Sequence, residues 1–391
     1  MGPTRSLGIA LHPTSLPGGR FGPEAYAFVD WLEAAGAGFW QVLPLHPPDR
    51  FGSPYASSSA FAGWEGLLAD PGARVEPSAC REFERRHPYW APDWLDYAGP
   101  GALEGQVRFE REWSALRAYA LERGIRLIGD MPIYVAPGGC DHRARPGLFL
   151  DGSLVAGVPP DALNPAGQRW GNPLYDWEAM ERDGYRWWIE RMRRALELAD
   201  VFRIDHFRGF AAFWAIPATG GANSGSWQPG PGAAPFRAAE RELGPLPVIA
   251  EDLGVITPDV VALREELGFP GMAVMIWAFS GRPESPHRLE NHLENQVVYT
   301  TTHDMETLAA SFPGEDVWPI VESALSSPAR LVVLPVQDVL GLGSEARLNR
   351  PGVAEGNWRW RLEPGQLGPA DAARLRKAAE GTGRARRLLR A

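Results

Sequence analysis

Carboxylates stand near the ends of four short apolar runs in this sequence. Asp130 lies within one run, Asp205 and Glu251 lie near the ends of the next two, and Asp304 closes a later one. In a barrel of parallel strands, the catalytic groups come from the carboxyl-terminal ends of the strands. Like charges around one point repel each other unless they have separate roles or a cationic partner. The pattern therefore predicts a catalytic site built from carboxylates.

The residues around Asp205 indicate how two of these carboxylates differ. Arg203 and Asp205 are two positions apart, so on a strand their side chains share a face and the guanidinium can hold the carboxylate. We expect this pairing to lower the pKa of Asp205 and keep it ionised, as a nucleophile requires. Glu251 lies near other carboxylates and is predicted to be partly buried, so we expect a raised pKa and a bound proton.

An ionised carboxylate and a protonated one on adjacent strands match retaining glycoside chemistry. The first attacks the anomeric carbon and the second protonates the leaving oxygen. Asp304 would then support the oxocarbenium-like transition state. A structural ion pair is the alternative for Arg203 and Asp205 taken alone. The convergence of four strand ends favours the catalytic interpretation.

Eight short, mostly apolar runs are the candidate strands that must position these groups. Each run is continuously apolar, as are strands buried on both faces of a parallel sheet. Helical periodicity separates several of them, most clearly at residues 23–35 and 257–267. This alternation predicts an α/β fold, a (β/α)8 TIM barrel with inserted subdomains and no separate C-terminal β domain. The runs are residues 7–11, 40–45, 125–135, 201–205, 247–252, 272–279, 297–304 and 329–336.

Two stretches are too long for single connections in such a barrel. Residues 47–123 carry several tryptophans and short helical pieces, and we predict an inserted subdomain between the second and third strands. Residues 136–177 are rich in Gly and Pro, and we predict a long ordered loop over the barrel mouth. The whole of residues 1–391 is then a single catalytic barrel.

The composition excludes several other functions. A net charge of -9 without a basic block argues against nucleic acid as a partner. Lys377 is the only lysine, so Schiff-base and phosphate-loop chemistry lack an amine in the body of the fold. No run approaches the roughly 20 apolar residues that cross a bilayer, and residues 7–11 are too short for a signal-peptide core. We expect a cytoplasmic protein without a membrane partner.

Aromatic residues outside the helical patterns are candidates for stacking on sugar rings. Trp31, Trp187 and Trp188 lie in helical patterns and are predicted to fill the core. Trp170 lies in what reads as an irregular loop, and Tyr55 follows the second run. A flat apolar face with a polar edge suits a sugar ring, so these two are the best candidates.

Several strings resemble the 4-α-glucanotransferase family, also called amylomaltase or disproportionating enzyme and related to the α-amylases. They follow the family's order over nearly the whole chain. The resemblance implies a (β/α)8 barrel that transfers an α-1,4-glucan segment to the 4-hydroxyl of another sugar through a covalent ester, with no metal or organic cofactor. The implied partners are maltooligosaccharides or other α-1,4-glucans. The strings are LHPTSLPG, WQVLPL, SPYASSSAFAG, GDMPIYVA, VAGVPPDALNPAGQRWGNPLYDW, FRIDHFRGF, AEDLGVITPDV, FPGM, PVQDVLGLGSEARLN and GNWRWR.

The resemblance also implies roles for single residues. Asp205 would be the nucleophile, Glu251 the general acid/base and Asp304 the transition-state stabiliser, in agreement with the roles inferred from the strand ends. The implied substrate-binding residues are Arg203 holding the nucleophile, His303 bonding the donor-site sugar, Asp130 supporting that network, Tyr55 stacking on the same ring, and Ser53, Gln168, Trp170, His206 and Asn349 lining the cleft.

The chain departs from the family pattern at the rim of the expected site. It is a shortened member, with a reduced insertion between the second and third runs. Met305 and Glu306 replace the usual Asn-Asp after His-Asp, Thr301 replaces a Gly, and Ser280 replaces an acidic residue. These changes bear on acceptor length, on cyclic products and on the balance between transfer and hydrolysis.

Three other functions compete with glucan transfer. An α-1,4-glucan hydrolase with weak transfer would share every carboxylate. A catalytically silent glycan-binding barrel would not need Asp205, Glu251 and Asp304 intact. A metal-dependent hydrolase would use histidines near strand ends, but no His-x-His spacing occurs. Those histidines are His12, His46, His206 and His303, of which the first two are interpreted as positional.

Overall fold

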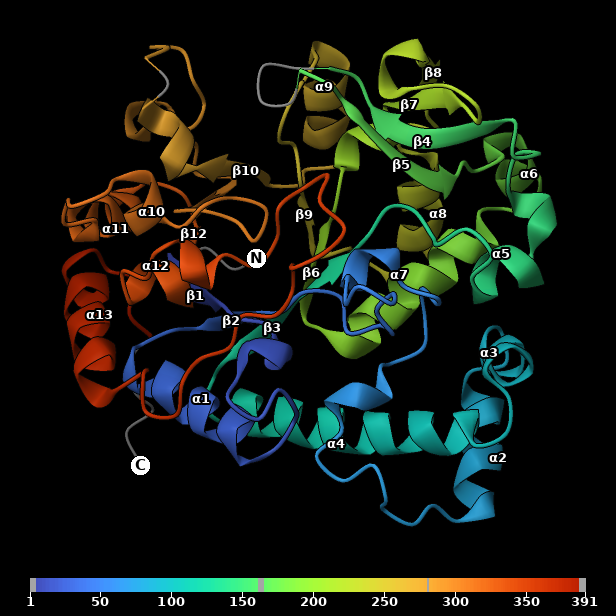
Figure 1. Cartoon of the computed structure of the whole chain (residues 1–391), viewed down its shortest axis with the longest axis horizontal. Helices are drawn as coiled ribbons and strands as arrows, with labels where there is room; N and C mark the ends of the chain where they lie inside the picture. The colour runs from blue at the N-terminus through green and yellow to red at the C-terminus, as the bar shows by residue number, and fades with distance from the viewer. Residues whose placement is uncertain (1–4, 161–164, 280, 387–391) are drawn as a thin grey trace.

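An eight-stranded parallel sheet forms the centre of the molecule (Figure 1). The computed structural model describes residues 5–160, 165–279 and 281–386. The strand order is β10-β11-β12-β1-β2-β3-β6-β9, so β12, late in the chain, lies beside β1. Each of the eight predicted runs overlaps one strand of this sheet. The strands are β1 (Ser6–Ala10), β2 (Phe39–Gln41), β3 (Arg126–Met131), β6 (Val201–Ile204), β9 (Val248–Ala250), β10 (Gly271–Val274), β11 (Gln296–Tyr299) and β12 (Leu331–Pro335).

The sheet curls into a nearly closed barrel, which confirms the predicted (β/α)8 fold. At the seam between β9 and β10, the amide of Ala250 donates to the carbonyl of Pro270 at 2.9 Å. The amide of Met272 donates to the carboxylate of Asp252 at 2.7 Å, and Arg264 donates to the same carboxylate at 2.9 Å. At this part of the seam, the Asp252 carboxylate therefore accepts the amide of Met272 in place of a backbone carbonyl.

The apolar strands form the inner core because both of their faces are buried. Phe39, Ile128, Val297 and Val333, from four different strands, belong to one buried cluster inside the barrel. Two larger clusters fill the space between the barrel wall and the surrounding helices. The polar residues that follow the strands are thereby confined to the strand ends.

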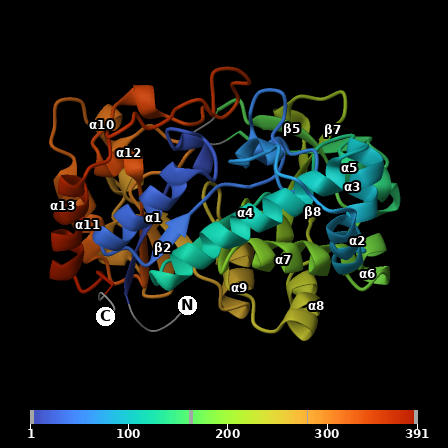
Figure 2. The same ribbon diagram turned by 90° about the horizontal axis from the view of Figure 1, so that it is seen from below.

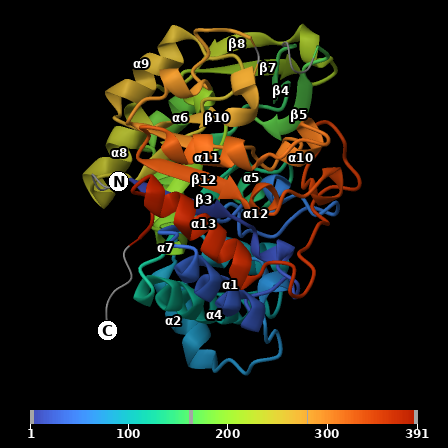
Figure 3. The same ribbon diagram turned by 90° about the vertical axis from the view of Figure 1, so that its left-hand side faces the viewer.

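Helices surround the barrel (Figures 1 to 3). They include α1 (Pro23–Ala34), α7 (Arg186–Leu198), α9 (Pro258–Glu266) and α11 (Trp318–Ser326), of which α1 and α9 lie in the predicted helical segments 23–35 and 257–267. Pro23 begins α1, where its missing amide proton is not needed. Thr257 precedes α9, and its side chain makes no capping hydrogen bond. Helix α13 (Pro369–Gly381) lies beside α1, with which it is in contact.

Residues 47–123 contain three α-helices, α2 (Pro77–Arg86), α3 (Ala91–Ala98) and α4 (Ala102–Glu122). Figure 2 shows α4 crossing the molecule, with α2 and α3 near one of its ends. Trp90 and Trp94 are buried in the same cluster as Met131 and Ile133 from the end of β3. This segment therefore packs continuously onto the barrel.

A second sheet lies on the far side of the barrel from α1 and α4 (Figures 1 and 3). It is antiparallel, in the order β5-β4-β7-β8, and draws its strands from both sides of β6 in the sequence. Residues 136–177 thus contain regular structure, and Trp170 lies on a strand and not in an irregular loop. The strands are β4 (Leu154–Val158), β5 (Gln168–Pro173), β7 (Ala212–Pro217) and β8 (Ser226–Pro229).

Candidate active site

The barrel brings Asp130, Arg203 and Asp205 together at the ends of β3 and β6. Asp130 and Arg203 are direct partners in the register of these strands. Arg203 donates from Nε to Asp130 Oδ1 at 3.1 Å and from Nη2 to Oδ2 at 2.8 Å. The same Nη2 donates to Asp205 Oδ1 at 2.9 Å. The Asp130 side chain is 0% exposed while that of Asp205 is 28% exposed, so Asp205 faces the open side of this network.

Tyr55 joins this network from the segment that follows β2. Its hydroxyl donates to Asp130 Oδ2 at 2.6 Å and accepts from Arg203 Nη2 at 3.2 Å. Its ring stacks on His303, with the ring centroids 5.0 Å apart. Residues 55, 130, 203 and 303 therefore form one connected assembly, although they are distant in the sequence.

Glu251 lies beside Asp205 because β9 pairs with β6. The amide of His206 donates to Glu251 Oε2 at 2.6 Å, and the amide of Leu253 donates to Oε1 at 2.9 Å. His206 adopts a left-handed backbone with φ of 52°, which is uncommon for a residue other than Gly. This turn directs an amide of the Asp205 loop onto the Glu251 carboxylate, and so fixes the two groups relative to each other.

Burial dominates the protonation of both carboxyl groups. Burial and repulsion from Asp205 raise the pKa of Glu251 to about 8, in the expected direction. The expected lowering of the Asp205 pKa is wrong. Burial raises it to about 7, because Arg203 opposes burial only in part and repulsion from Asp130 and Asp304 adds to it. Arg203 shares its charge between two carboxylates, which the spacing of Arg203 and Asp205 alone does not reveal.

Asp304 completes the carboxylate set after β11. Asn349 Nδ2 donates to Asp304 Oδ1 at 2.6 Å, and His303 Nε2 lies 3.3 Å from the same oxygen. The Asp304 side chain is 42% exposed. Arg347, which the sequence analysis did not select, donates to the backbone carbonyl of Asp304 at 3.1 Å and pairs with Glu306 at 2.7 Å. The sequence signal that could have selected Arg347 is its position two residues before Asn349.

The second sheet places two predicted cleft residues near this group. Trp170 is 37% exposed, and its ring meets His206 edge-on with centroids 4.8 Å apart. Its indole nitrogen donates to Gln168 Oε1 at 3.1 Å. Ser53 instead lies at the start of a short 3-10 helix, with its amide bonded to Asp49, and no contact places it against the carboxylates. Ser280 lies outside the described residues.

A cavity adjoins the site and is lined by residues including His12, Arg203, Tyr299 and His303. Burial lowers the pKa of His12 to about 3, so its ring is neutral, and Nδ1 accepts the amide of Leu43 at 3.2 Å. His46 is likewise buried, with a pKa lowered to about 4. Both fit the positional role predicted for them.

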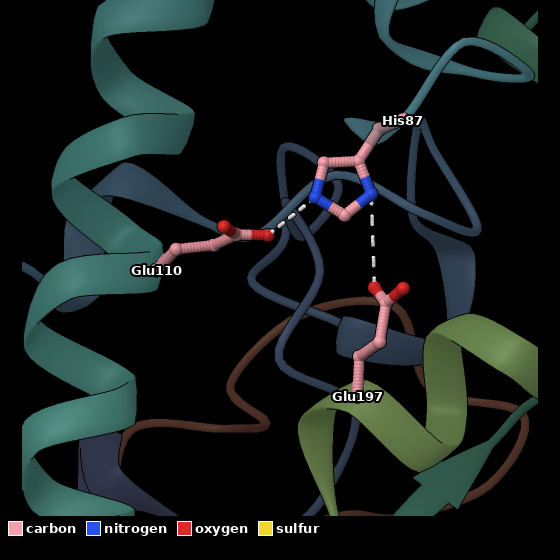
Figure 4. Close-up of side chains that lie close together, drawn as sticks. All are labelled: His87, Glu110 and Glu197. Atoms are coloured by element: carbon pink, nitrogen blue, oxygen red, sulfur yellow. Dashed lines mark ion pairs between the residues drawn. The ribbon is translucent and has the colours of Figure 1, made fainter. Parts of the chain in front are cut away.

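The metal-dependent hydrolase considered above would require a cluster of metal-ligating side chains near the strand ends. Within the described ranges, the three-residue cluster with suitable spacing is His87, Glu110 and Glu197 (Figure 4), which includes none of the strand-end histidines. Arg194 Nη1 lies 3.1 Å from Glu110 and 2.8 Å from Glu197. Arg194 thus already pairs with both carboxylates, and the cluster is an ion-pair network of the α4–α7 region.

A family model described as 4-alpha-glucanotransferase matches residues 11–94, 104–315 and 310–367. The chain belongs to the 4-α-glucanotransferase family. The segments that position all three carboxylates lie inside the matched residues. The resemblance found from the sequence strings is therefore confirmed.

Curated relatives in this 4-α-glucanotransferase family cover most of the chain. The protein of Thermus thermophilus is 40% identical over 97% of this chain and 99% of its own length. That alignment runs over 495 positions, against 391 residues here, so this chain carries gaps relative to that protein. A chloroplastic/amyloplastic 4-alpha-glucanotransferase of Arabidopsis thaliana is 39% identical over 92% of this chain and 81% of that protein.

Among solved structures, an amylomaltase from Streptococcus agalactiae in complex with acarbose has a TM-score of 0.91 and 29% identity, covering 97% of this chain and 100% of that one. An amylomaltase from Corynebacterium glutamicum has a TM-score of 0.82 at 16% identity, covering 96% of this chain and 75% of that one, and shows the fold alone. None of the described helices is long and apolar enough to cross a membrane.

Proposed function

We propose that this chain is a 4-α-glucanotransferase that works by retaining double displacement. The observation that carries the proposal is the pairing of Asp205 with Glu251, held together by the His206 amide at the adjoining ends of β6 and β9. Two carboxyl groups that lie close together suit the retaining geometry, in which one is the nucleophile. Family membership supports the choice of α-1,4-glucans as substrates.

In the first step, Asp205 attacks the anomeric carbon as the bond to the leaving glycosidic oxygen breaks, and the proton of Glu251 passes to that oxygen. The product is a glycosyl ester of Asp205. In the second step, the acceptor's 4-hydroxyl gives its proton to Glu251 and attacks the same carbon, which releases Asp205. Asp304 is proposed to stabilise the positive charge that develops on the sugar in both steps.

The surrounding residues are proposed to bind the donor sugar. Arg203 holds Asp205 through the 2.9 Å hydrogen bond, and buried Asp130 holds Arg203 through two. Partly exposed Trp170 offers a ring face and edge of the kind that packs on sugars. The residues proposed to bind the donor sugar, either directly or, like Asp130, by supporting a neighbour, are Tyr55, Asp130, Arg203, His303, Ser53, Gln168, Trp170, His206 and Asn349.

Incubation with maltotriose alone tests the reaction. We expect glucose together with maltooligosaccharides longer than maltotriose, because a sugar hydroxyl replaces water at the second step. The products are separated by anion-exchange chromatography. Glucose and maltose without longer products would assign the chain as a hydrolase. Binding without turnover would assign it as a silent glycan-binding barrel.

The pH dependence of kcat/KM follows from the two raised pKa values. Activity requires one proton on the Asp205–Glu251 pair, held by Glu251. Below about pH 7 both groups carry protons and the nucleophile is lost, whereas above about pH 8 both are ionised and the acid is lost. We expect a narrow bell-shaped profile in initial rates of glucose release from maltotriose. A rate that stays constant as the pH rises well beyond 8 would contradict this assignment.

A cytoplasmic location stays a prediction from the sequence. The relatives' names include chloroplastic proteins, so the family does not fix the compartment. Fractionation of the source cells, with detection of the native chain by antibody, would test the prediction.

A further inference from the structure

Asp338 is a buried carboxylate for which the proposed reaction has no use. It lies in the short helix α12 (Val336–Val339) directly after β12, and it is 1% exposed. Its carboxylate accepts three hydrogen bonds: from Thr300 Oγ1 at 2.6 Å, Thr301 Oγ1 at 2.7 Å and the amide of Leu308 at 2.9 Å. A buried carboxylate is costly unless its oxygens are bonded in this way.

The three donors flank one segment of the chain. Thr300 and Thr301 follow β11, and Leu308 begins helix α10 (Leu308–Ser311). Between them lie residues 302–307, which include His303 and Asp304. The Asp338 carboxylate, directly after the neighbouring strand β12, thus holds both ends of this six-residue segment. The two threonine hydroxyls donate to Oδ2, and the Leu308 amide donates to Oδ1.

The attachment is internal, whereas the side chains that it carries face the site. Thr300 is 0% exposed and Thr301 is 3% exposed, while the Asp304 side chain is 42% exposed. Loss of the Asp338 carboxylate would leave three buried donors without an acceptor, which destabilises the turn. The turn would then relax at the residues between the anchors, where Asp304 lies.

We propose that Asp338 is a positioning residue, which sets the place of His303 and Asp304 by fixing both ends of the 302–307 segment. The inference rests on the proposed function, because it assigns Asp338 to the transition-state side of the same reaction. A displacement of about 1 Å in a catalytic group can cost on the order of 100-fold in rate. The effect should therefore fall on kcat more than on KM.

The test compares Thr301→Val with Thr301→Ser in the full chain. Valine keeps the shape of threonine and removes the hydroxyl donor, whereas serine keeps the donor. We expect Thr301→Val to lower kcat for maltotriose disproportionation about 10-fold with KM changed less than about 3-fold, and Thr301→Ser to restore most of kcat. Asp338→Asn should lower kcat further, by about 100-fold. Thr382→Val, at the end of α13, is the matched control and should leave kcat unchanged.

The outcomes separate positioning from simple bracing of the fold. If Thr301→Val lowers the melting temperature and leaves kcat unchanged, Asp338 only braces β11 against β12 and the proposal is overturned. An equal loss of kcat in Thr301→Ser also overturns it, because the hydroxyl would not be the operative group. If Asp338→Asn does not fold, the Thr301 pair decides alone. Wild-type protein that yields no disproportionation refutes the proposed function instead.

Discussion

Asp205→Asn is expected to abolish glucan transfer, with kcat reduced by on the order of 10⁴-fold or more. The amide nitrogen and oxygen of Asn cannot form the glycosyl ester on which the double displacement depends. The fold should survive, because Arg203 keeps its two hydrogen bonds to Asp130. Removing a carboxyl group from a site where Asp130 and Asp304 repel it also relieves repulsion. Initial rates on maltotriose and thermal unfolding measure the two effects.

A matched variant controls for the loss of one negative charge. Asp259 is an exposed carboxylate in the first turn of α9 and does not belong to the hydrogen-bonded network of Asp130, Arg203 and Asp205, so Asp259→Asn should retain wild-type kcat. Full activity in Asp205→Asn, with an unchanged melting temperature, would refute Asp205 as the nucleophile.

Glu251→Gln is expected to lower kcat on maltotriose by about 10² to 10⁴-fold, because the variant cannot protonate the leaving oxygen. The substitution has a structural cost as well. Both oxygens of Glu251 accept backbone amides, and Gln offers one oxygen and one NH2 group. One amide therefore loses its acceptor, at a cost of about 1 to 3 kcal/mol. A lower melting temperature should accompany the loss of rate.

The choice of donor separates the chemical loss from the structural one. α-Maltosyl fluoride has a leaving group that needs no proton, so its first step in Glu251→Gln should proceed much closer to the wild-type rate than maltotriose does. Fluoride release measures this step directly. Glu266→Gln, on the exposed end of α9, is the control for the substitution itself. An equal loss with both donors would contradict the acid role of Glu251.

The barrel could be predicted from the sequence because its signal is local. Continuous apolar runs such as residues 329–336 are required wherever a strand is covered on both faces, so each strand carries its own signature. The helices α1 and α7 likewise carry a local signal, because each has an apolar stripe that packs on the core. The second sheet was missed for the converse reason. Strand β8 is largely exposed, β5 has only Pro173 fully buried, and both strands contain Pro, so their sequences resemble loops.

The carboxylate set was also accessible from the sequence, because polar residues at strand ends are conspicuous after apolar runs. The pairing of Arg203 with Asp205 followed from their spacing of two, and the structure has that hydrogen bond. The pKa of Asp205 did not follow. It depends on burial and on Asp130 and Asp304, which come from other strands. The register of the barrel strands decides which residues, distant in the sequence, contribute to this pKa.

The sequence by itself determined the barrel, the family and the four strand-end carboxylates, since each rests on residues close together in the chain. Only the tertiary structure decided how these groups are shared and held. It placed Arg203 between two carboxylates. It also directed the amide of His206, the residue after Asp205, onto the Glu251 carboxylate. It also set Asp338 under the 302–307 segment. The physical reason is that hydrogen bonds and burial act through space, between strands that pair only once the barrel has formed.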